Sequence, residues 1–390
     1  MKNKISILGS TGSIGDAVFK LLKKNKDYDF YILSGYKNYK KIKYQIKNYR
    51  PKYFVIFDDI TYLKIKKKLY NNKTIILSSK DFLKYNFKKC KIAVAAIPGI
   101  AGLKPTLNII KYTKKILIAN KESVVCGWNL IKNTAKKNNT QILPIDSEHF
   151  SIMNLLETAK KNEIEKIYLT ASGGPFLNYS KKMIVKAKPA DAIKHPTWKM
   201  GKKISIDSAT LMNKIFEVIE AQKLFSIDFS KIEIVIHPQS LVHAIIRYKN
   251  GLYKLLYFET DMAIPIGNVL FGKNFEIKKF KNIKDNKKSN FQNQLNFINV
   301  NENKFPAIKL KPLLNKYASL PIVLNAANEI FVDQFIKKNI SFYSIINYLF
   351  VLLKDPKLRK YAIKRPSNLK TILTLDKWTR SKAMEILKKK

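Results

Sequence analysis

Cysteine, arginine and long apolar runs are all scarce in this chain of 390 residues, and each scarcity excludes a class of protein. The two cysteines, Cys90 and Cys126, form no CxxC pair, which argues against a disulfide scaffold or a zinc ribbon and fits a reducing compartment. No apolar run reaches the ~18 residues of a membrane span. The apolar part of residues 4–9 is too short for a signal peptide. We therefore expect a cytoplasmic protein without a membrane partner.

Acidic residues are also few, 28 against 74 basic ones, which gives a formal net charge of +46. A charge this high suggests a nucleic-acid-binding protein. However, only five of the basic residues are arginine, the side chain that forks onto guanine and phosphate, and the lysines are scattered along the chain. We therefore interpret the charge as compositional bias that attracts anionic ligands. No specific nucleic-acid partner is expected, and nucleic-acid binding remains the alternative.

Alternating apolar runs and lysine-rich amphipathic stretches fill residues 1–146 and predict a Rossmann-like parallel sheet with helices on both faces. Residues 147–270 mix both patterns, with a helix from about 209 to 225, and predict a central α+β catalytic domain on an antiparallel sheet. Residues 271–305 are polar and predict a linker or surface excursion. Residues 306–390 show helical periodicity and predict a C-terminal helical bundle. The predicted fold class is α/β.

A glycine-rich segment, GSTGSIG at residues 9–15, lies between the first predicted strand and helix. Its GxxGxxG spacing is a variant of the dinucleotide fingerprint, in which glycines let the backbone approach a pyrophosphate at a helix N-terminus. The alternative is a plain glycine turn. The next strand ends in Lys37 and Asn38 where an NAD enzyme places an acid. Lys37 suits a 2′-phosphate, so NADPH is favoured.

Two carboxylates, Asp146 and Glu148, follow an apolar run in the segment PIDSEH at residues 144–149. In extended backbone, side chains two residues apart point to one face, so both acids can converge on one hard cation such as Mg²⁺ or Mn²⁺. They could instead act as a general acid and base, or merely cap a helix. Glu217 is the candidate third ligand.

The segment around Glu217 groups Ser208, Asn213, Lys214 and Glu217. Asn213 and Glu217 are four apart and share a helical face, and Lys214 is three residues before Glu217. We place Ser208 near the start of this helix, where exposed N–H groups favour phosphate. An ordinary amphipathic helix, which is the alternative, would not need these four residue types on one side.

Three further segments carry candidate site residues. Lys121, in ANKES at residues 119–123, follows a predicted parallel strand and could polarise a substrate oxygen, although it could equally be a surface lysine. Ser172 precedes two glycines and a proline, and could bind an anion or simply belong to a turn. Residues 195–201, HPTWKMG, place Trp and Met between Pro and Gly, which suits a mobile flap that closes over a ligand.

Together these motifs resemble one family, 1-deoxy-D-xylulose 5-phosphate reductoisomerase. The matching segments are GSTGSIG (9–15), ANKES (119–123), PIDSEH (144–149), ASGGPF (171–176), HPTWKMGKKISIDSATLMNK (195–214), IHPQSLVHA (236–244) and LNAANE (324–329). The resemblance implies NADPH, a divalent metal (Mg²⁺ or Mn²⁺, with Co²⁺ as a further option), a small phosphorylated sugar as substrate, and a homodimer.

The resemblance also implies residue roles. For the metal it implies the ligands Asp146, Glu148 and Glu217, with Lys121 as a catalytic residue at the reacting end of the substrate. For the substrate it implies Ser147, Glu148, Ser172, His195, Ser208, Asn213, Lys214 and Glu217. For NADPH it implies Thr11, Gly12, Ser13, Ile14, Lys37, Asn38, Asn120, Glu122 and Gly201. Trp198 and Met200 would belong to the flap, and Met262 would lie near the nicotinamide.

The reaction that the resemblance implies is isomerisation and reduction of 1-deoxy-D-xylulose 5-phosphate to 2-C-methyl-D-erythritol 4-phosphate, a step of non-mevalonate isoprenoid precursor synthesis. A cation held by three carboxylates agrees with this chemistry, because it keeps open positions for a chelating keto-alcohol. The alternative is a plain NADP-dependent dehydrogenase of a phosphorylated sugar without rearrangement.

Overall fold

The computed structural model describes residues 2–23, 25, 27–69, 73–198, 200–280, 294–363 and 365–388. It divides into two compact units. Unit 1 comprises the described residues of 1–123, 129–146 and 262–287, and unit 2 those of 124–128, 147–261 and 288–390. Among the described residues no helix combines the length and apolar character needed to cross a membrane. Part of the predicted linker, residues 281–293, lies outside the described residues.

Unit 1 is built on a seven-stranded sheet in the order β4-β3-β2-β1-β5-β6-β7. All neighbouring strands are parallel, as predicted for the N-terminal region. The strands are β1 (Asn3–Leu8), β2 (Tyr28–Gly35), β3 (Tyr53–Ile56), β4 (Ile75–Ser78), β5 (Cys90–Ala95), β6 (Thr113–Ile118) and β7 (Gln141–Pro144). The strand order reverses between β1 and β5, and ligands of such sheets bind at this switch point, beyond the carboxyl ends of the strands.

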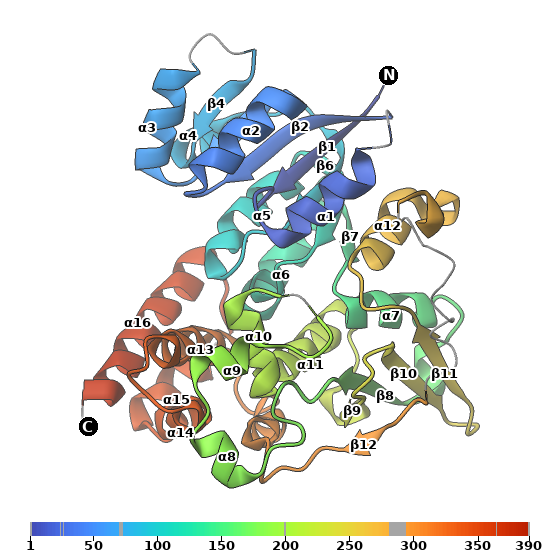
Figure 1. Ribbon diagram of the computed structural model, residues 1–390, viewed down its shortest axis with the longest axis vertical. Coiled ribbons are helices and arrows are strands. Elements are labelled where there is room, and N and C mark those ends of the chain that lie inside the picture. The colour runs from blue at the N-terminus through green and yellow to red at the C-terminus, as the bar shows by residue number, and fades with distance from the viewer. Residues whose placement is uncertain are drawn as a thin grey trace. The chain divides into compact units, whose positions relative to one another are not determined.

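Helices connect consecutive strands of unit 1 (Figure 1). Polar side chains define several of the helix starts. The side chains of Asn38, Asp58 and Asn120 each accept a bond from a backbone N–H of the first turn, which replaces a missing helical partner. The α-helices are α1 (Ser13–Leu22), α2 (Tyr39–Tyr49), α3 (Asp59–Lys68), α4 (Ser79–Lys84), α5 (Leu103–Ile110), α6 (Lys121–Asn138, which also enters unit 2) and α12 (Ala263–Phe271).

Helix α12 differs from our predicted domain division, which ended the central domain at residue 270. Its buried Ile266 and Leu270 pack in one apolar cluster with Ile5 and Val18 of the N-terminal region. The apolar side chains of 262–271 thus find their partners far back in the sequence. This long-range packing places α12 in unit 1.

Unit 2 contains a five-stranded sheet in the order β11-β10-β8-β9-β12. The strands are β8 (Ile164–Ala171), β9 (Ile232–Ile236), β10 (Val242–Tyr248), β11 (Tyr253–Tyr257) and β12 (Ile298–Asn299). We predicted an antiparallel sheet, and the other neighbouring strands are antiparallel, but β8 and β9 pair in parallel. The described residues between β8 and β9 include four α-helices, which is ample for a parallel crossover.

The central helices of unit 2 are α7 (Ser147–Leu156), α8 (Lys181–Val185), α9 (Pro189–Ile193), α10 (Lys202–Ala209) and α11 (Met212–Phe225). The predicted helix 209–225 therefore begins only at Met212, because Leu211 adopts a left-handed backbone with φ of 62° and separates α10 from α11. Helices α7 and α11 pack against each other and against strands of the sheet.

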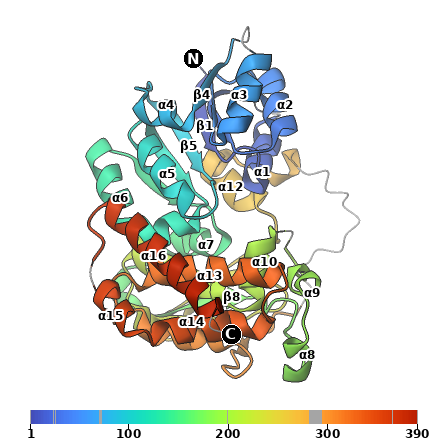
Figure 2. The same ribbon diagram turned by 90° about the vertical axis from the view of Figure 1, so that its left-hand side faces the viewer.

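The C-terminal helices of unit 2 are α13 (Leu320–Ile336), α14 (Phe342–Leu353), α15 (Pro356–Ala362) and α16 (Leu369–Lys388). Helix α13 packs against both α14 and α16, which also contact each other (Figure 2). The predicted helix near 307–317 is instead a 3₁₀-helix, Pro306–Leu313, with Pro312 inside it. The C-terminal helices group with the central sheet in one unit rather than separately, which differs from the division that we predicted.

Truncating Ile266 tests the assignment of α12 to unit 1. Ile266 is fully buried, so Ile266→Ala should lower the free energy of unfolding by about 3 kcal/mol. The exposed Asn268→Ala on the same helix serves as the control. Urea denaturation measures both variants, and equal small effects would contradict the packing of α12 described above.

Candidate active site

The turn after β7 carries the acidic pair that the sequence singled out. β7 ends at Pro144 and α7 begins at Ser147, so Glu148 lies in the first turn of a helix. Our reason for the convergence of Asp146 and Glu148, an extended backbone, was therefore wrong. The two acids nevertheless converge: Asp146, Glu148 and Glu217 each offer one oxygen atom, and these atoms lie within 4.8 Å of one another. Asp146 is the last residue of unit 1 and is covalently bonded to Ser147.

Lys214 holds the two glutamates of this group together. Its Nζ lies 2.7 Å from Oε1 of Glu148 and also pairs with Glu217. Burial alone would lower the pKa of Lys214, but Glu148 and Glu217 outweigh that effect and raise its pKa. Lys214 is therefore a protonated, buried cation, which offsets part of the repulsion between the carboxylates.

Glu217 is positioned by its own helix and by α7. Asn213, one turn earlier on α11, donates a side-chain hydrogen bond to Glu217. His149 Nε2 lies 3.0 Å from the main-chain oxygen of Glu217. Glu217 is 1% exposed, so its carboxylate is desolvated and is held by Asn213 and Lys214 rather than by water. Three carboxylate oxygens in such a group match the oxygen ligands that Mg²⁺ and Mn²⁺ prefer.

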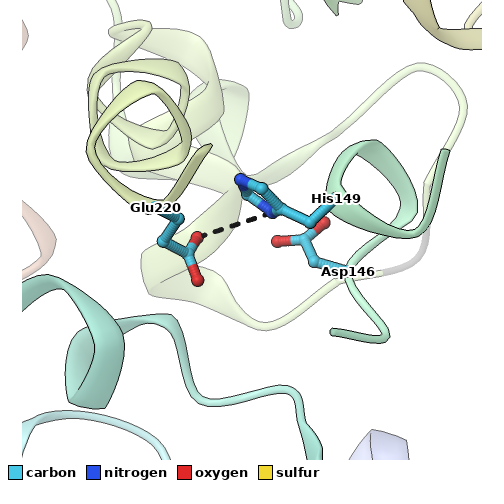
Figure 3. A group of neighbouring side chains, drawn as sticks. All are labelled: Asp146, His149 and Glu220. Carbon is cyan, nitrogen blue, oxygen red and sulfur yellow. Dashed lines mark ion pairs between the residues drawn. The ribbon is translucent and has the colours of Figure 1, made fainter. Parts of the chain in front are cut away.

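A second group of potential ligands adjoins this one. Figure 3 shows His149 of α7 facing Glu220 of α11, with Asp146 beside them, and Nδ1 of His149 is 3.9 Å from a carboxylate oxygen of Glu220. Sequence reasoning missed Glu220 and gave His149 no role. The signal was available, because Glu217 and Glu220 are three residues apart and share one helical face.

Lys121 lies in unit 1 with the other members of its segment. Its Nζ is 3.1 Å from Oδ2 of Asp146. The neighbouring Asn120 caps α6 through Ser123 N and donates to Oε2 of Glu122 at 2.9 Å. Because Lys121 contacts a candidate metal ligand and is only 9% exposed, the reading of this residue as an ordinary surface lysine is wrong.

Ser172, His195 and Ser208 form a second polar cluster, in unit 2. His195 Nε2 lies 2.9 Å from Ser172 Oγ and 3.1 Å from Ser208 Oγ. Burial, followed by the charge of Lys214, lowers the pKa of His195 to about 4, so the ring is neutral near pH 7. Ser208 lies in the last turn of α10 and not at the start of a helix as we expected, so its hydroxyl rather than a helix N-terminus is the group available to a phosphate.

The predicted flap at 195–201 is anchored by His195. Nδ1 of His195 accepts a bond from Trp198 N at 2.9 Å, and the Trp198 ring contacts His243 with centroids 5.9 Å apart. Gly201 lies at the start of α10 in unit 2, and a Cβ there would meet nothing within 4 Å. Lys199 lies outside the described residues.

The glycine loop of unit 1 has the close backbone contacts of a nucleotide loop. Gly9 has φ of +84°, and a Cβ there would lie 2.5 Å from the oxygen of Ala96, beside the switch point of the sheet. A Cβ on Gly15 would lie 2.2 Å from Ser10 O. Only glycine fits these positions, and helix α1 begins at Ser13 with its N–H groups next to the loop. The loop thus fits a pyrophosphate.

Lys37 and Asn38 follow β2 at the carboxyl edge of the same sheet. The Lys37 side chain is 66% exposed and lies 3.9 Å from Asp58 Oδ1. A surface pocket is lined by Lys37, Tyr39, Thr61, Lys64, Lys67 and Lys68. The positive lining of this pocket suits a phosphate group.

Three family profiles match this chain. The profile of 1-deoxy-D-xylulose 5-phosphate reductoisomerase matches residues 5–127, that of its C-terminal domain matches 142–225, and a further DXP reductoisomerase C-terminal profile matches 259–382. A protein named 1-deoxy-D-xylulose 5-phosphate reductoisomerase from Pelagibacter ubique (strain HTCC1062) is 44% identical over 378 residues, 96% of each chain. The chain belongs to the 1-deoxy-D-xylulose 5-phosphate reductoisomerase family.

Solved structures of this family have the same fold. A DOX-P reductoisomerase in complex with NADPH, fosmidomycin and magnesium is 33% identical, with a TM-score of 0.90 over 99% of this chain and 98% of that one. The reductoisomerase from Zymomonas mobilis in complex with NADPH is 32% identical, with a TM-score of 0.85 over 99% of both chains. Similarity over whole chains means that both units, and not an isolated motif, match the reductoisomerase family.

Replacing His195 should change how the stability of the protein depends on pH. Its pKa is about 4 in the folded protein and 6.5 when unfolded, so between these values the unfolded chain binds the extra proton. Above pH 6.5 the neutral His195 ring therefore costs the folded protein no stability. As the pH falls from 6.5 towards 4, protonation of the unfolded chain lowers the free energy of unfolding. His195→Asn should therefore show a shallower loss of Tm between pH 7 and 4.5 than the wild type. Parallel pH profiles would contradict the assigned shift.

Proposed function

We propose that this protein isomerises and reduces 1-deoxy-D-xylulose 5-phosphate to 2-C-methyl-D-erythritol 4-phosphate, with NADPH as reductant and Mg²⁺ or Mn²⁺ as the metal. Co²⁺ is a further candidate metal. The observation that carries the proposal is the group of Asp146, Glu148 and Glu217, two of which pair with Lys214. The chain that holds this group is 44% identical to a protein named 1-deoxy-D-xylulose 5-phosphate reductoisomerase. Solved relatives bound to NADPH, fosmidomycin and magnesium support the same reaction.

The three carboxylates are the proposed metal ligands. When bound, the cation would act as a Lewis acid on oxygen atoms of the substrate, and NADPH would supply the hydride. Ser147 Oγ donates to Glu148 Oε2 at 2.6 Å, which orients one ligand while the serine borders the substrate. Lys121, which pairs with Asp146, would interact with the reacting end of the substrate.

The polar cluster of Ser172, His195 and Ser208 is the proposed phosphate site, together with Asn213 and Lys214. A neutral imidazole can donate one N–H hydrogen bond to a phosphate oxygen without burying a second positive charge near Lys214. Lys214 serves both regions, because it contacts the glutamates and its charge affects His195. Residues 195–201 would close over the substrate and exclude water, which strengthens these interactions.

The cofactor residues remain as the resemblance implies them, with the loop and the basic pocket of unit 1 in support. They are Thr11, Gly12, Ser13, Ile14, Lys37, Asn38, Asn120, Glu122 and Gly201. Lys37 would contact the 2′-phosphate, which NADH lacks. Trp198 and Met200 stay assigned to the flap, and Met262 to the neighbourhood of the nicotinamide.

We further propose a homodimer in the cytoplasm. β11 is an edge strand of the unit 2 sheet, and its Tyr253 and Leu255 are 56% and 43% exposed. An exposed apolar edge strand is a surface that a second copy could cover. Cys90 and Cys126 are both buried, which suits a reducing compartment.

The direct test follows NADPH absorbance with 1-deoxy-D-xylulose 5-phosphate, with and without Mg²⁺ or Mn²⁺. We expect oxidation only when metal is present, and a product with a branched carbon skeleton. An unrearranged polyol as product would indicate a plain dehydrogenase. Full activity in a chelator would contradict the metal site.

Glu217→Gln should lower kcat by about 10³-fold or more, since the loss of one anionic ligand removes several kcal/mol of electrostatic stabilisation. NADPH binding, followed by fluorescence, should stay unchanged because the glycine loop lies in unit 1. Glu157→Gln, at an exposed position just after α7, is the matched control. Wild-type turnover by Glu217→Gln would exclude it as a ligand.

A further inference from the structure

One buried carboxylate next to the proposed phosphate site has partners on two helices. Asp207 precedes Ser208 in α10, and its side chain is only 3% exposed. Its Oδ2 accepts from Lys203 at 2.8 Å, one turn earlier on the same helix. Its Oδ1 accepts from Nδ2 of Asn328 at 2.7 Å. Asn328 lies on α13, 121 residues further along the chain, and is fully buried.

This contact joins the C-terminal helices to the part of unit 2 that carries the phosphate site. The Nζ of Lys203 also lies 5.6 Å from the ring centroid of Phe216, which precedes Glu217 on α11. Asp207 and its two partners thus connect α10, α11 and α13. Breaking a buried hydrogen bond to a charged group is costly, because the charge loses both water and its partner.

The backbone between α10 and α11 gives a reason for this anchor. Leu211 has φ of 62°, a conformation that costs a side-chain-bearing residue energy and must be held by its surroundings. Ser208 lies before this residue, and Asn213 and Lys214 lie after it. A shift of α10 relative to α11 would therefore move Ser208 away from Asn213 and Lys214, the side chains proposed to bind the substrate phosphate.

We propose that Asn328 is a positioning residue of the reductoisomerase reaction. By fixing the Asp207 carboxylate it sets the position of α10, and so holds Ser208 in register with Asn213 and Lys214 for the substrate phosphate. The segment LNAANE, in which Asn328 lies, thereby gains a role in substrate binding. The inference rests on the proposed function, because the phosphorylated substrate is its readout.

The test uses the full chain with a second negative charge at position 328, facing the Asp207 carboxylate. Asn328→Asp sets two carboxylates against each other and should raise KM for 1-deoxy-D-xylulose 5-phosphate about tenfold or more. The Kd for NADPH, followed by fluorescence, should stay within about twofold. Asp333→Asn, at a partly exposed position of the same helix, should change neither value.

Exchanging donor and acceptor provides the rescue. In the double variant Asp207→Asn with Asn328→Asp, the amide at 207 can donate to the carboxylate at 328, while its oxygen accepts from Lys203. KM should then return to within about threefold of the wild type. If Asn328→Asp fails to fold, Asn328→Leu removes the donor without adding a charge. It should likewise raise KM for 1-deoxy-D-xylulose 5-phosphate and leave the Kd for NADPH within about twofold.

An unchanged KM in a folded Asn328 variant, a parallel loss of NADPH affinity, or no recovery in the double variant would each overturn the positioning role. These results differ from a failure of the proposed function. If the wild type does not turn over 1-deoxy-D-xylulose 5-phosphate, the proposed function itself is wrong. An active wild type together with Asn328 variants of unchanged KM contradicts only the positioning role.

Discussion

The site depends on the ion pairs between Lys214 and the glutamates Glu148 and Glu217. Two desolvated carboxylates brought together by α7 and α11 would repel each other strongly without a nearby cation. Lys214 supplies one positive charge, and a divalent metal would supply more. The same lysine affects His195 of the phosphate cluster, so the metal and phosphate regions are electrostatically coupled. A change in the charge of either region will shift the electrostatic potential, and so the pKa values, in the other.

Much of this site could be predicted from the sequence, because most of its candidate residues lie in short segments with recognisable spacing. The glycine loop, Lys37, the acids at 146 and 148, and the grouping of Asn213, Lys214 and Glu217 follow from local spacing on strands and helices. The parallel sheet of unit 1 follows from alternating patterns in the same way. Recognition of the family then assigned roles to residues such as Ser172 and His195, whose partners lie far apart in sequence.

Features that rest on long-range packing could not be predicted. The parallel pairing of β8 with β9, and the inclusion of α12 in unit 1, depend on partners distant in sequence. The break at Leu211 was missed because a leucine gives no local sign of a left-handed backbone. The bond from Asn328 to Asp207 joins residues 121 positions apart, and an asparagine within an apolar helix is ambiguous until its neighbour is known.

The most direct measurement of the central claim is a titration with Mn²⁺ followed by electron paramagnetic resonance. If Asp146, Glu148 and Glu217 hold one cation, the wild type should bind one Mn²⁺ per chain, and a Glu148→Gln, Glu217→Gln double variant should lose that site while remaining folded. Equal binding of Mn²⁺ by the wild type and the folded double variant would contradict the account.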